Sequence, residues 1–327
     1  MTVPLSELLE TARVVSLPLT TRFRGISTRE ALLLRGPAGW TEFSPFVEYE
    51  DAEAAAWLAA ALDFGWREPE LPANAPTRIR VNATLPAVDP DRVNDVLGRF
   101  PGCRTVKVKV AEAGQPLSDD VARVSNARDF LGPDGRIRVD ANGGWNLDEA
   151  EHAIHALAEF DLEYVEQPCA TVDELAQIRK RVKYMGIPIA ADESVRKAED
   201  PMAVARAKAA DILIIKAQPL GGIERALQII ADAGLPVVIS SALDTSVGLS
   251  MGAYLAASIP SALTYDCGLA TAALLAADIT DQPLLPTDGA IDVRRIDVDE
   301  DLLHRHAANA ARTTWWLERL SRVHALL

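Results

Sequence analysis

Short apolar runs rich in valine and isoleucine recur along the middle of the chain, and each ends in polar or charged residues. Eight such runs are VNATL, VKVKV, IRVDAN, YVEQP, PIAADES, LIIKAQ, VVISS and LTYDC. Helical patterns such as DEAEHAIHALAEF and IERALQIIADAG lie between them. Parallel strands buried on both faces have this composition, and eight of them alternating with helices close a barrel. The pattern therefore predicts an α/β fold with a TIM-like (β/α)7β barrel.

The pattern before residue 77 is different. Two strand-like runs, VVSLPL and ALLLRG, precede an alanine-rich helix predicted over 51–64, and LPANAPTRI has the composition of a linker. This predicts an α+β capping domain over 1–76 and a barrel over 77–288 that carries the functional site. The remaining segment, 289–327, shows no strand–helix rhythm. Its helical pattern DEDLLHRHAANAARTTWWLERL predicts that it packs back on the capping domain and completes it.

Charged or polar residues stand at the ends of these apolar runs at nearly constant intervals. The intervals are 31, 26, 26, 24, 24 and 26 residues, and the residues in order are Lys109, Asp140, Glu166, Asp192, Lys216, Ser240 and Asp266. One strand, one helix and two short loops require about 25 to 30 residues, so the interval is that of repeated βα units. If each residue ends its own strand, all of them meet on the carboxyl-terminal rim of the barrel, where active sites of such barrels lie.

Strand parity adds neighbours to this group. Side chains two residues apart point to the same face of a strand, so Lys107 accompanies Lys109, and Arg138 and Asn142 accompany Asp140. The interior of a barrel is normally apolar, and a buried charge is costly unless it is paired or bound to a metal. The spacing as a set therefore indicates a functional site, although any single lysine or aspartate could belong to a structural ion pair.

Three of these residues are carboxylates that could share a cation. Asp140, Glu166 and Asp192 offer hard oxygen ligands, which favour Mg²⁺ or Mn²⁺ over zinc. The five histidines lie on a predicted helix or in the tail and are interpreted as surface residues.

The lysines predict the chemistry. A lysine has a pKa of about 10.4 in water, and a neighbouring cation, a bound metal and partial burial all lower it. Lys107 and the metal provide this setting for Lys109. A metal that binds a substrate carboxylate stabilises the enediolate formed when the adjacent carbon loses its proton, and a lysine on each face can give or take protons. The pattern thus predicts proton abstraction next to a carboxylate, with Lys109, Lys216 and Lys107 in the catalytic group.

Composition limits the partners. A net charge of −14 and a pI near 4.9 argue against nucleic acid or an anionic membrane as partner. Three widely separated cysteines fit a reducing compartment. The start MTVPLSELLE lacks the features of a signal peptide, and no stretch of about 18 apolar residues could span a bilayer. We therefore expect a cytoplasmic enzyme that acts on a small carboxylate and has no obligate protein partner.

The motifs as a set resemble the enolase superfamily in its muconate lactonizing subgroup. The residues that carry this resemblance are Lys107-Val-Lys109, Asp140-Ala-Asn142, Glu166-Gln-Pro168, Asp192-Glu-Ser194 and Lys216. It covers nearly the whole chain, including the capping domain. Within the subgroup, GWTEFSPF at 39–46, KAQPLGG at 216–222 and SSAL at 240–243 resemble the o-succinylbenzoate synthase family.

The resemblance implies a reaction and a role for each site residue. It implies that Asp140, Glu166 and Asp192 bind Mg²⁺, for which Mn²⁺ can substitute. It also implies that Lys109 removes the α-proton and then protonates the departing hydroxyl in a syn elimination, while Lys216 stabilises the enediolate from the opposite face. The expected reaction is dehydration of 2-succinyl-6-hydroxy-2,4-cyclohexadiene-1-carboxylate on the route to menaquinone.

Further residues are expected to orient the metal ligands or to bind substrate. They are Arg138, Asn142, Glu193, Ser240 and Ser241. A structural role stays open for each of them. Arg22 and Arg24 could reach the site from the capping domain, although pairing at the surface is the reading that we favour for both.

Three alternatives remain open at this point. The same two lysines could serve an N-acylamino acid racemase. Dipeptide epimerases also resemble the chain, but they usually show Asp-x-Asp at the last strand, where this sequence has Asp266-Cys-Gly268. The third alternative is a catalytically silent barrel that binds a metal or another ligand.

Overall fold

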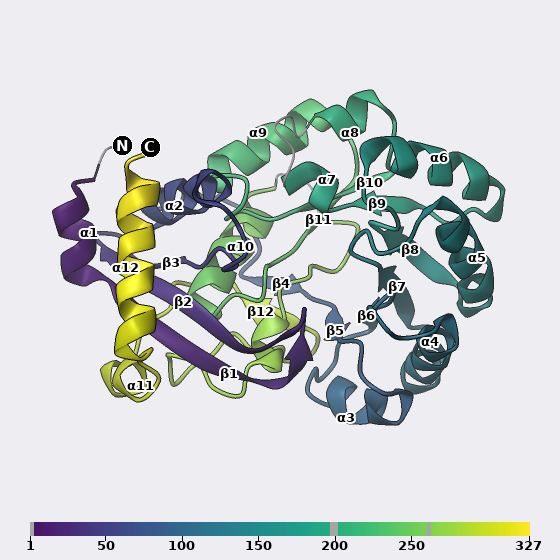
Figure 1. Cartoon of the computed structure of the whole chain (residues 1–327), viewed down its shortest axis with the longest axis horizontal. Helices are drawn as coiled ribbons and strands as arrows, with labels where there is room; N and C mark the ends of the chain where they lie inside the picture. The colour runs from purple at the N-terminus through teal and green to yellow at the C-terminus, as the bar shows by residue number, and fades with distance from the viewer. Residues whose placement is uncertain (1–2, 197–201, 260–262) are drawn as a thin grey trace.

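The computed structural model describes residues 3–196, 202–259 and 263–327. Its main sheet has seven parallel strands in the spatial order β11-β10-β9-β8-β7-β6-β5, which is their order in the sequence. They are β5 (Ala83–Leu85), β6 (Thr105–Lys109), β7 (Arg136–Asp140), β8 (Leu162–Glu166), β9 (Ile189–Ala191), β10 (Ile212–Ile215) and β11 (Val237–Ile239). Figure 1 shows the sheet curving, with helices along its outer side. Strands β9, β10 and β11 are entirely apolar, as expected when both faces are buried, whereas β6, β7 and β8 also carry charged residues.

A short segment around Cys267 joins the two edges of this sheet. Cys267 forms a parallel bridge with Val81, just before β5, and Gly268 forms one with Ser240, just after β11. Backbone hydrogen bonds of 2.9 and 2.8 Å accompany these bridges. The segment takes the place of an eighth strand, so the predicted (β/α)7β barrel is confirmed.

Helices connect successive strands on the outside of the barrel. They are α3 (Val93–Leu97), α4 (Leu117–Leu131), α5 (Leu147–Leu157), α6 (Val172–Val182), α7 (Glu193–Arg196), α8 (Ala203–Arg206), α9 (Ile223–Ala233) and α10 (Ser246–Ser258). Sequence-encoded caps set where two of them begin. Asn146 and Glu149 form a capping box at the start of α5, and Thr171 and Glu174 do so at α6.

The capping domain contains an antiparallel sheet in the order β1-β2-β3. Its elements are α1 (Leu5–Thr11), β1 (Arg13–Phe23), β2 (Ile26–Gly36), β3 (Gly39–Phe43) and α2 (Asp51–Trp66). The helix predicted over 51–64 is therefore confirmed and ends two residues later. Helix α2 packs very closely on the sheet: a Cβ on Gly36 would lie 2.1 Å from the carbonyl oxygen of Gly65.

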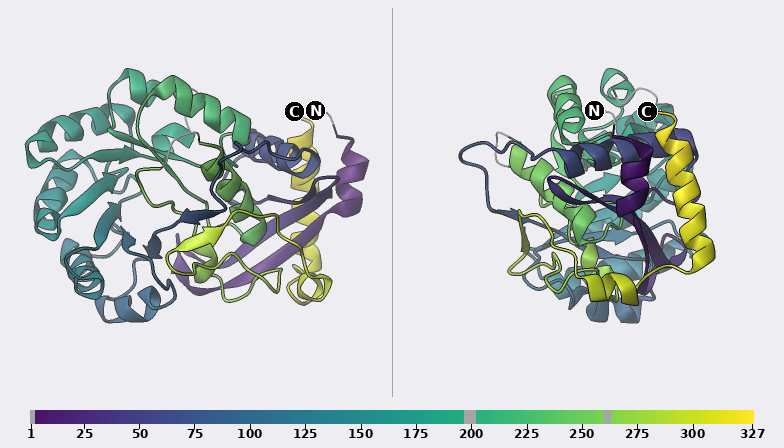
Figure 2. Two further views of the ribbon diagram at one scale, coloured as in Figure 1. Left: turned by 180° about the vertical axis from the view of Figure 1, so that it is seen from behind. Right: turned by 90° about the vertical axis from the view of Figure 1, so that its left-hand side faces the viewer.

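The last part of the chain returns to this sheet, as predicted. It forms β12 (Ala290–Asp292), α11 (Glu300–Arg305) and α12 (Ala310–His324). Figures 1 and 2 show α12 lying along the capping domain, with the two ends of the chain close together. Glu30 on β2 anchors α12, because it accepts hydrogen bonds from the Arg312 guanidinium and from Trp316 Nε1.

Two details differ from the sequence-based expectation. The single helix predicted over the tail is interrupted, because Ala307 pairs with Val15 of β1 and Asn309 caps a new helix by accepting from Arg312 N at 3.0 Å. The segment interpreted as a linker contributes its last residues to β4 (Arg78–Arg80), which pairs antiparallel with β12. In the part of the chain that the structure describes, none of the helices has the length and apolar character that crossing a membrane requires.

Candidate active site

The structure brings the five regularly spaced charged residues together. Lys109, Asp140 and Glu166 are the last residues of β6, β7 and β8, while Asp192 and Lys216 directly follow β9 and β10. The strand register places Lys109 opposite Asp140, and Asp140 opposite Glu166. All five side chains therefore stand at the carboxyl-terminal rim of the barrel.

Three lysines neutralise the three carboxylates. The Lys107 ammonium lies 2.9 Å from Glu166 Oε1 and 3.1 Å from Asp140 Oδ2. The Lys109 ammonium lies 2.5 Å from the same Asp140 oxygen, and the Lys216 ammonium lies 2.6 Å from Asp192 Oδ2. The carboxylates and lysines thus form one buried charge network.

The network treats the two lysines of β6 differently. Burial lowers the pKa of Lys107, but the negative charges of Glu166 and Asp140 outweigh it and hold that pKa well above the usual range. At Lys109, burial and the positive charge of Lys107 both lower the pKa. The negative charge of Asp140 raises it but does not outweigh them, so the pKa of Lys109 is lower than usual. Lys107 is therefore a permanent cation, and Lys109 is the lysine that gives up its proton more readily.

The carboxylates fit a hard divalent cation by their chemistry. Asp140, Glu166 and Asp192 supply oxygen atoms alone, and Glu166 Oε2 is buried without a hydrogen-bond donor among the described residues. Burial, together with the charge of Asp140, raises the pKa of Glu166 to about 8. Within residues 3–196, 202–259 and 263–327, no three acidic, histidine or cysteine side chains enclose a metal position as they stand. In this arrangement Lys107 bridges Asp140 and Glu166, and Lys216 pairs with Asp192.

Asn142 connects the rim loops. Its backbone has φ of +47°, a left-handed conformation that asparagine tolerates better than most residues. In this conformation its amide nitrogen donates to Asp140 Oδ1 at 3.0 Å, and its side chain accepts from Lys109 at 2.6 Å and donates to Glu193 at 3.2 Å. Asn142 and Glu193 thus belong to the group around Lys109.

Gln167 is a site residue that the sequence analysis did not single out. Its side-chain oxygen accepts from the backbone nitrogens of Asp192 at 3.0 Å and Ser194 at 3.2 Å, and its nitrogen donates to Cys169 O and Ser194 Oγ. The side chain is fully buried. The sequence signal for it was an amide side chain directly after Glu166, the carboxylate that ends β8. Consecutive side chains of a strand point to opposite faces, so the Gln167 side chain points away from the barrel axis.

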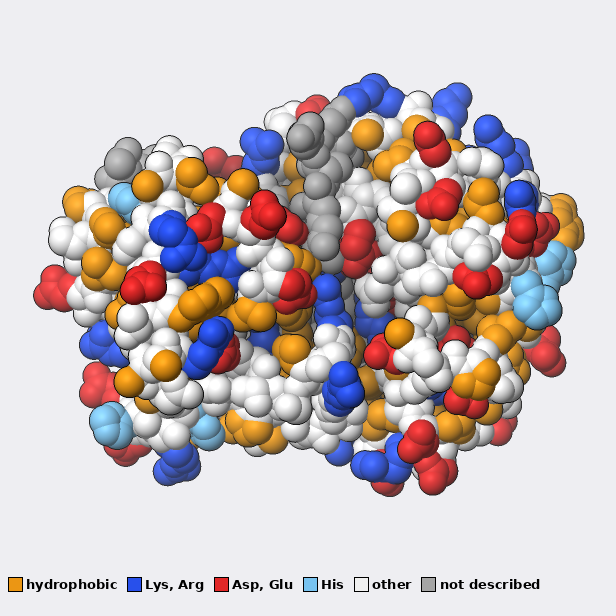
Figure 3. All heavy atoms as spheres, in the orientation of Figure 1, with side chains coloured by type: hydrophobic (Ala, Val, Ile, Leu, Met, Phe, Trp, Pro, Cys, Tyr) orange, Lys and Arg blue, Asp and Glu red, His pale blue; other side chains and the backbone are white. Residues whose placement is uncertain are grey.

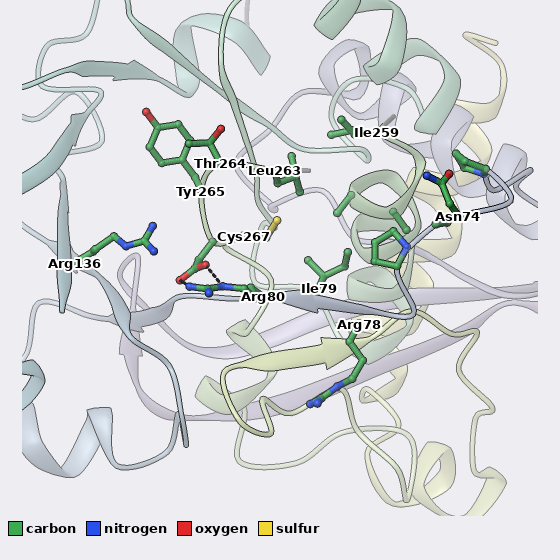
Figure 4. A pocket seen from close by; sticks show the side chains of 16 residues that line it. Asn74, Arg78, Ile79, Arg80, Arg136, Ile259, Leu263, Thr264, Tyr265 and Cys267 are labelled. Atoms are coloured by element: carbon green, nitrogen blue, oxygen red, sulfur yellow. Dashed lines mark hydrogen bonds and ion pairs between the residues drawn. The ribbon is translucent and has the colours of Figure 1, made fainter. Parts of the chain in front are cut away.

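Asp266 does not lie on this rim, although it follows Ser240 by 26 residues and so belongs to the regularly spaced residues of the sequence. It accepts hydrogen bonds from Arg80 at 2.8 Å and from Thr105 at 2.7 Å, at the beginning of β6 rather than its end. Figure 4 shows Arg80 in this ion pair, in a cavity of about 490 Å³ that Arg136 also lines. The expectation for Asp266 is therefore wrong: the interval counts residues but not their position along the strand, and here the residue begins the closing segment.

Arg138 also lies away from the rim carboxylates. Its guanidinium stacks 4.9 Å from the Tyr164 ring and bonds to Asn82, Glu163 and the carbonyl of Asp266. The side chain is completely buried. These contacts place Arg138 in a polar layer inside the barrel, away from the rim carboxylates.

A cavity of about 30 Å³ lies between the rim and the capping domain. Lys109, Asp192 and Lys216 line it on one side, and Phe23 at the end of β1 and Arg24 in the following turn line it on the other. The segment after β11 forms a further wall with Ser240, Ser241, Ala242 and Leu243. This cavity adjoins a groove of about 580 Å³ with which it shares Phe23, Arg24, Lys109 and Asn142. Figure 3 shows basic side chains deep in the hollow at the centre of this face.

The serines and arginines named from the sequence all border this space. Ser240 faces the cavity, whereas the Ser241 hydroxyl donates to Gly268 O at 2.7 Å and lies 3.0 Å from the Thr271 hydroxyl. Arg22 lines the groove. Arg24 pairs with Glu48 at 3.9 Å and also lines the cavity, so surface pairing does not describe it fully.

Comparison with known families agrees with this architecture. Residues 95–297 match the family model described as Enolase C-terminal domain-like, and residues 14–65 match Enolase N-terminal domain-like. The structure superimposes on 2-chloromuconate cycloisomerase from Rhodococcus opacus with a TM-score of 0.77, at 22% identity over 91% of this chain and 98% of that one. The fold is thus that of a capped enolase-type barrel.

Curated relatives narrow the family. An o-succinylbenzoate synthase of Mycolicibacterium smegmatis is 52% identical over 324 residues, covering 99% of this chain and 98% of the relative. The o-succinylbenzoate synthase of Thermobifida fusca is 52% identical over 318 residues, covering 96% of each. The chain therefore belongs to the enolase superfamily and, within it, to the o-succinylbenzoate synthase family.

Proposed function

We propose that this protein is a hydro-lyase that converts 2-succinyl-6-hydroxy-2,4-cyclohexadiene-1-carboxylate to o-succinylbenzoate in menaquinone biosynthesis. The observation that carries the proposal is the pairing of Lys109 and Lys216 with carboxylates of one rim, in a chain 52% identical to o-succinylbenzoate synthases over nearly its full length. Dehydration of this substrate requires a base next to a carboxylate and a cation that stabilises the enediolate.

Asp140, Glu166 and Asp192 are the proposed ligands of Mg²⁺, for which Mn²⁺ can substitute. Sites of the enolase superfamily depend on such a divalent cation. When bound, it supplies positive charge beside the substrate carboxylate. The all-oxygen donor set and the donor-free Glu166 Oε2 support this assignment.

Lys109 is the proposed base. Its pKa is lowered by burial and by the charge of Lys107, so it is the lysine of β6 best able to accept the α-proton. The same ammonium then gives a proton to the departing hydroxyl on the same face, which makes the elimination syn. Lys216, from another strand, remains a cation and stabilises the enediolate.

The remaining residues are proposed to position these groups. Asn142 fixes the Lys109 ammonium and is itself held by Glu193. Ser240, which faces the cavity, and Ser241 are proposed to hold a substrate carboxylate. For Arg138 we propose only support of the barrel interior, because its hydrogen bonds go to groups away from the rim carboxylates.

The experiment that tests the reaction compares dehydration with racemisation, because the two differ in how many lysines exchange protons with the substrate. We expect rapid conversion of the cyclohexadiene substrate to its aromatic product, and slow or undetectable α-deuterium exchange into N-succinylamino acids in D₂O. A kcat/KM for racemisation equal to or above that for dehydration would replace the proposed reaction by the racemase. Absence of both reactions would leave a barrel that binds ligands without catalysis.

We further propose the division into a cap over 1–76, a barrel over 77–288 and a tail over 289–327 that completes the cap. The three cysteines are free, which supports a cytoplasmic location. The charge of −14 supports a small-molecule carboxylate as the partner, without nucleic acid, a membrane surface or an obligate protein.

A further inference from the structure

The wall of the active-site cavity that follows β11 has a conformation that needs external support. Ser240, Ser241, Ala242 and Leu243 line the cavity there. Leu243 has φ of +62°, which is unfavourable for a residue with a branched side chain. Such a backbone persists only where its surroundings hold it in place.

A buried carboxylate of the capping domain binds the end of this wall. Glu42 Oε2, on β3, accepts from Thr245 N at 3.1 Å, Thr245 Oγ1 at 2.6 Å and Gly248 N at 3.1 Å. Its other oxygen accepts from Ser44 Oγ. Thr245 is the N-cap of α10, so the carboxylate also faces the positive end of that helix. The capping domain therefore holds both the wall and α10 in place through hydrogen bonds. In Figure 1, α10 lies next to β3, the strand that carries Glu42.

A second charged side chain of the cap holds the strained residue itself. Arg29 on β2 donates from Nε to Leu243 O at 3.0 Å, and its terminal nitrogen donates to Ser44 Oγ at 3.0 Å. Arg29 is 2% exposed and Glu42 is fully buried. Ser44 joins the two, so both groups act on the wall as one unit.

The fit at Gly248 shows how closely the carboxylate approaches the backbone. A Cβ at this position would lie 2.8 Å from Glu42 Oε2 and 2.7 Å from both Asp244 Cβ and Gln218 Nε2. Only a glycine leaves room for the carboxylate against the first turn of α10.

Arg29 and Glu42, which Ser44 bridges, could serve only to join two domains, and buried charges of opposite sign are weak evidence for stability. Here the hydrogen bonds go to the backbone of the cavity wall and of the helix that follows it, at Leu243, Thr245 and Gly248. We propose that Glu42 is a positioning residue of the active site: together with Arg29 it fixes residues 240–245 in the conformation that binds substrate. This inference deepens the proposed function and rests on it for the identity of the substrate.

The test compares two substitutions at Glu42. Glu42→Leu removes both acceptors while keeping apolar volume, whereas Glu42→Gln keeps an acceptor for Thr245 and Gly248 and can turn its amide toward Ser44. For Glu42→Leu we expect KM for the cyclohexadiene substrate to rise about tenfold, with a smaller fall in kcat, because buried donors lose their acceptor. Backbone amides of 241–248 should exchange with D₂O about tenfold faster in the protein without substrate. Glu42→Gln should restore both values to within about threefold of wild type.

Glu30→Leu is the matched control, because Glu30 lies on the same sheet but binds Arg312 and Trp316 of α12. It should lower the melting temperature and leave KM and the exchange of 241–248 unchanged. Equal effects of Glu30→Leu and Glu42→Leu would overturn the proposal, as would a folded Glu42→Leu with unchanged exchange.

If Glu42→Leu does not fold, Thr245→Val, which lacks the hydroxyl bonded to Glu42, must still accelerate exchange of 241–248; unchanged exchange there overturns the proposal. If the wild-type protein does not dehydrate the cyclohexadiene substrate, the proposed function fails. The exchange comparison then decides the positioning role by itself.

Discussion

Lys107 and Glu166 form a buried ion pair in the barrel, with 2.9 Å between Nζ and Oε1. The two residues come from strands that are not neighbours, and Lys107 also reaches Asp140 on the strand between them. The pKa of Lys107 stays well above its usual range because these carboxylates outweigh the effect of burial. Lys107 therefore acts as a fixed positive charge beside Lys109, and this difference supports the proposal that Lys109 carries out the proton transfers.

Replacing either proposed catalytic lysine should stop dehydration. We expect kcat of Lys109→Ala to fall by about 10³-fold or more, because the general base and acid are lost together. Lys216→Ala should also reduce kcat strongly, since its cation acts in the transition state. Lys180→Ala, at an exposed position on α6, is the control and should behave as wild type. Wild-type turnover by Lys109→Ala would show that the roles are assigned wrongly.

Removal of the metal should abolish activity reversibly. We expect no turnover in excess chelator and full recovery on addition of Mg²⁺ or Mn²⁺. Asp192→Asn should weaken Mg²⁺ binding by at least about 100-fold, since even groups that merely orient ligands contribute about 10- to 100-fold. Calorimetric titration measures the affinity, and circular dichroism checks that the fold is retained. Activity that persists in excess chelator would exclude the metal assignment.

Gln167 should matter for metal binding although it carries no charge. Its side chain holds the backbone at Asp192 and Ser194. We expect Gln167→Ala to lower Mg²⁺ affinity by about 10- to 100-fold, because Asp192 loses its orientation. Gln177→Ala, at an exposed position on α6, serves as the control. Equal affinities of the two variants would show that Gln167 only supports the fold.

Glu42 should make stability depend on pH. Burial, aided by the charge of Asp244, raises the pKa of Glu42 to about 7, whereas a glutamate in an unfolded chain titrates near ~4.3. The folded state therefore binds this proton more tightly than the unfolded state. Its contribution to the free energy of unfolding is complete below the unfolded pKa and is lost as pH rises through about 7.

Urea unfolding of wild type and Glu42→Gln over a pH series measures this effect. The stability of wild type relative to the variant should decline between about pH 4 and 7, because the glutamine cannot titrate. Parallel curves for the two proteins would mean that Glu42 is not the titrating group.

The sequence predicts those features that depend on local periodicity. The apolar runs locate all eight strand positions of the barrel, and the charged residues that end them, from Lys109 to Lys216, do meet at one rim. Asp266 fails because an interval of 26 residues does not say at which end of a strand a residue lies. The run LTYDC locates the segment that closes the barrel, but it does not show that this segment forms isolated bridges instead of a full strand.

Contacts between segments that are far apart in the sequence do not appear in the local pattern of apolar and polar residues. Glu42 and Thr245 are 203 positions apart, and no local pattern links them. The pairing of β4 with β12 and the bridge between Val15 and Ala307 are of the same kind. The sequence around Ala307 has a helical pattern, but the helix is interrupted there because Ala307 pairs with Val15 of β1. Such features follow from tertiary structure, which a single sequence shows only through resemblance.

The position of α12 on the capping sheet sets the order in which the protein can assemble. Phe43 packs edge-on against Trp316 at 6.0 Å between ring centres, so an early strand is covered by the last helix of the chain. At a synthesis rate of about 5 to 20 residues per second, some tens of seconds separate the two on the ribosome. During that interval β1, β2 and β3 expose apolar surface that the finished protein buries. Completion of this domain must therefore follow translation of the whole barrel, even though its first strands are made before it.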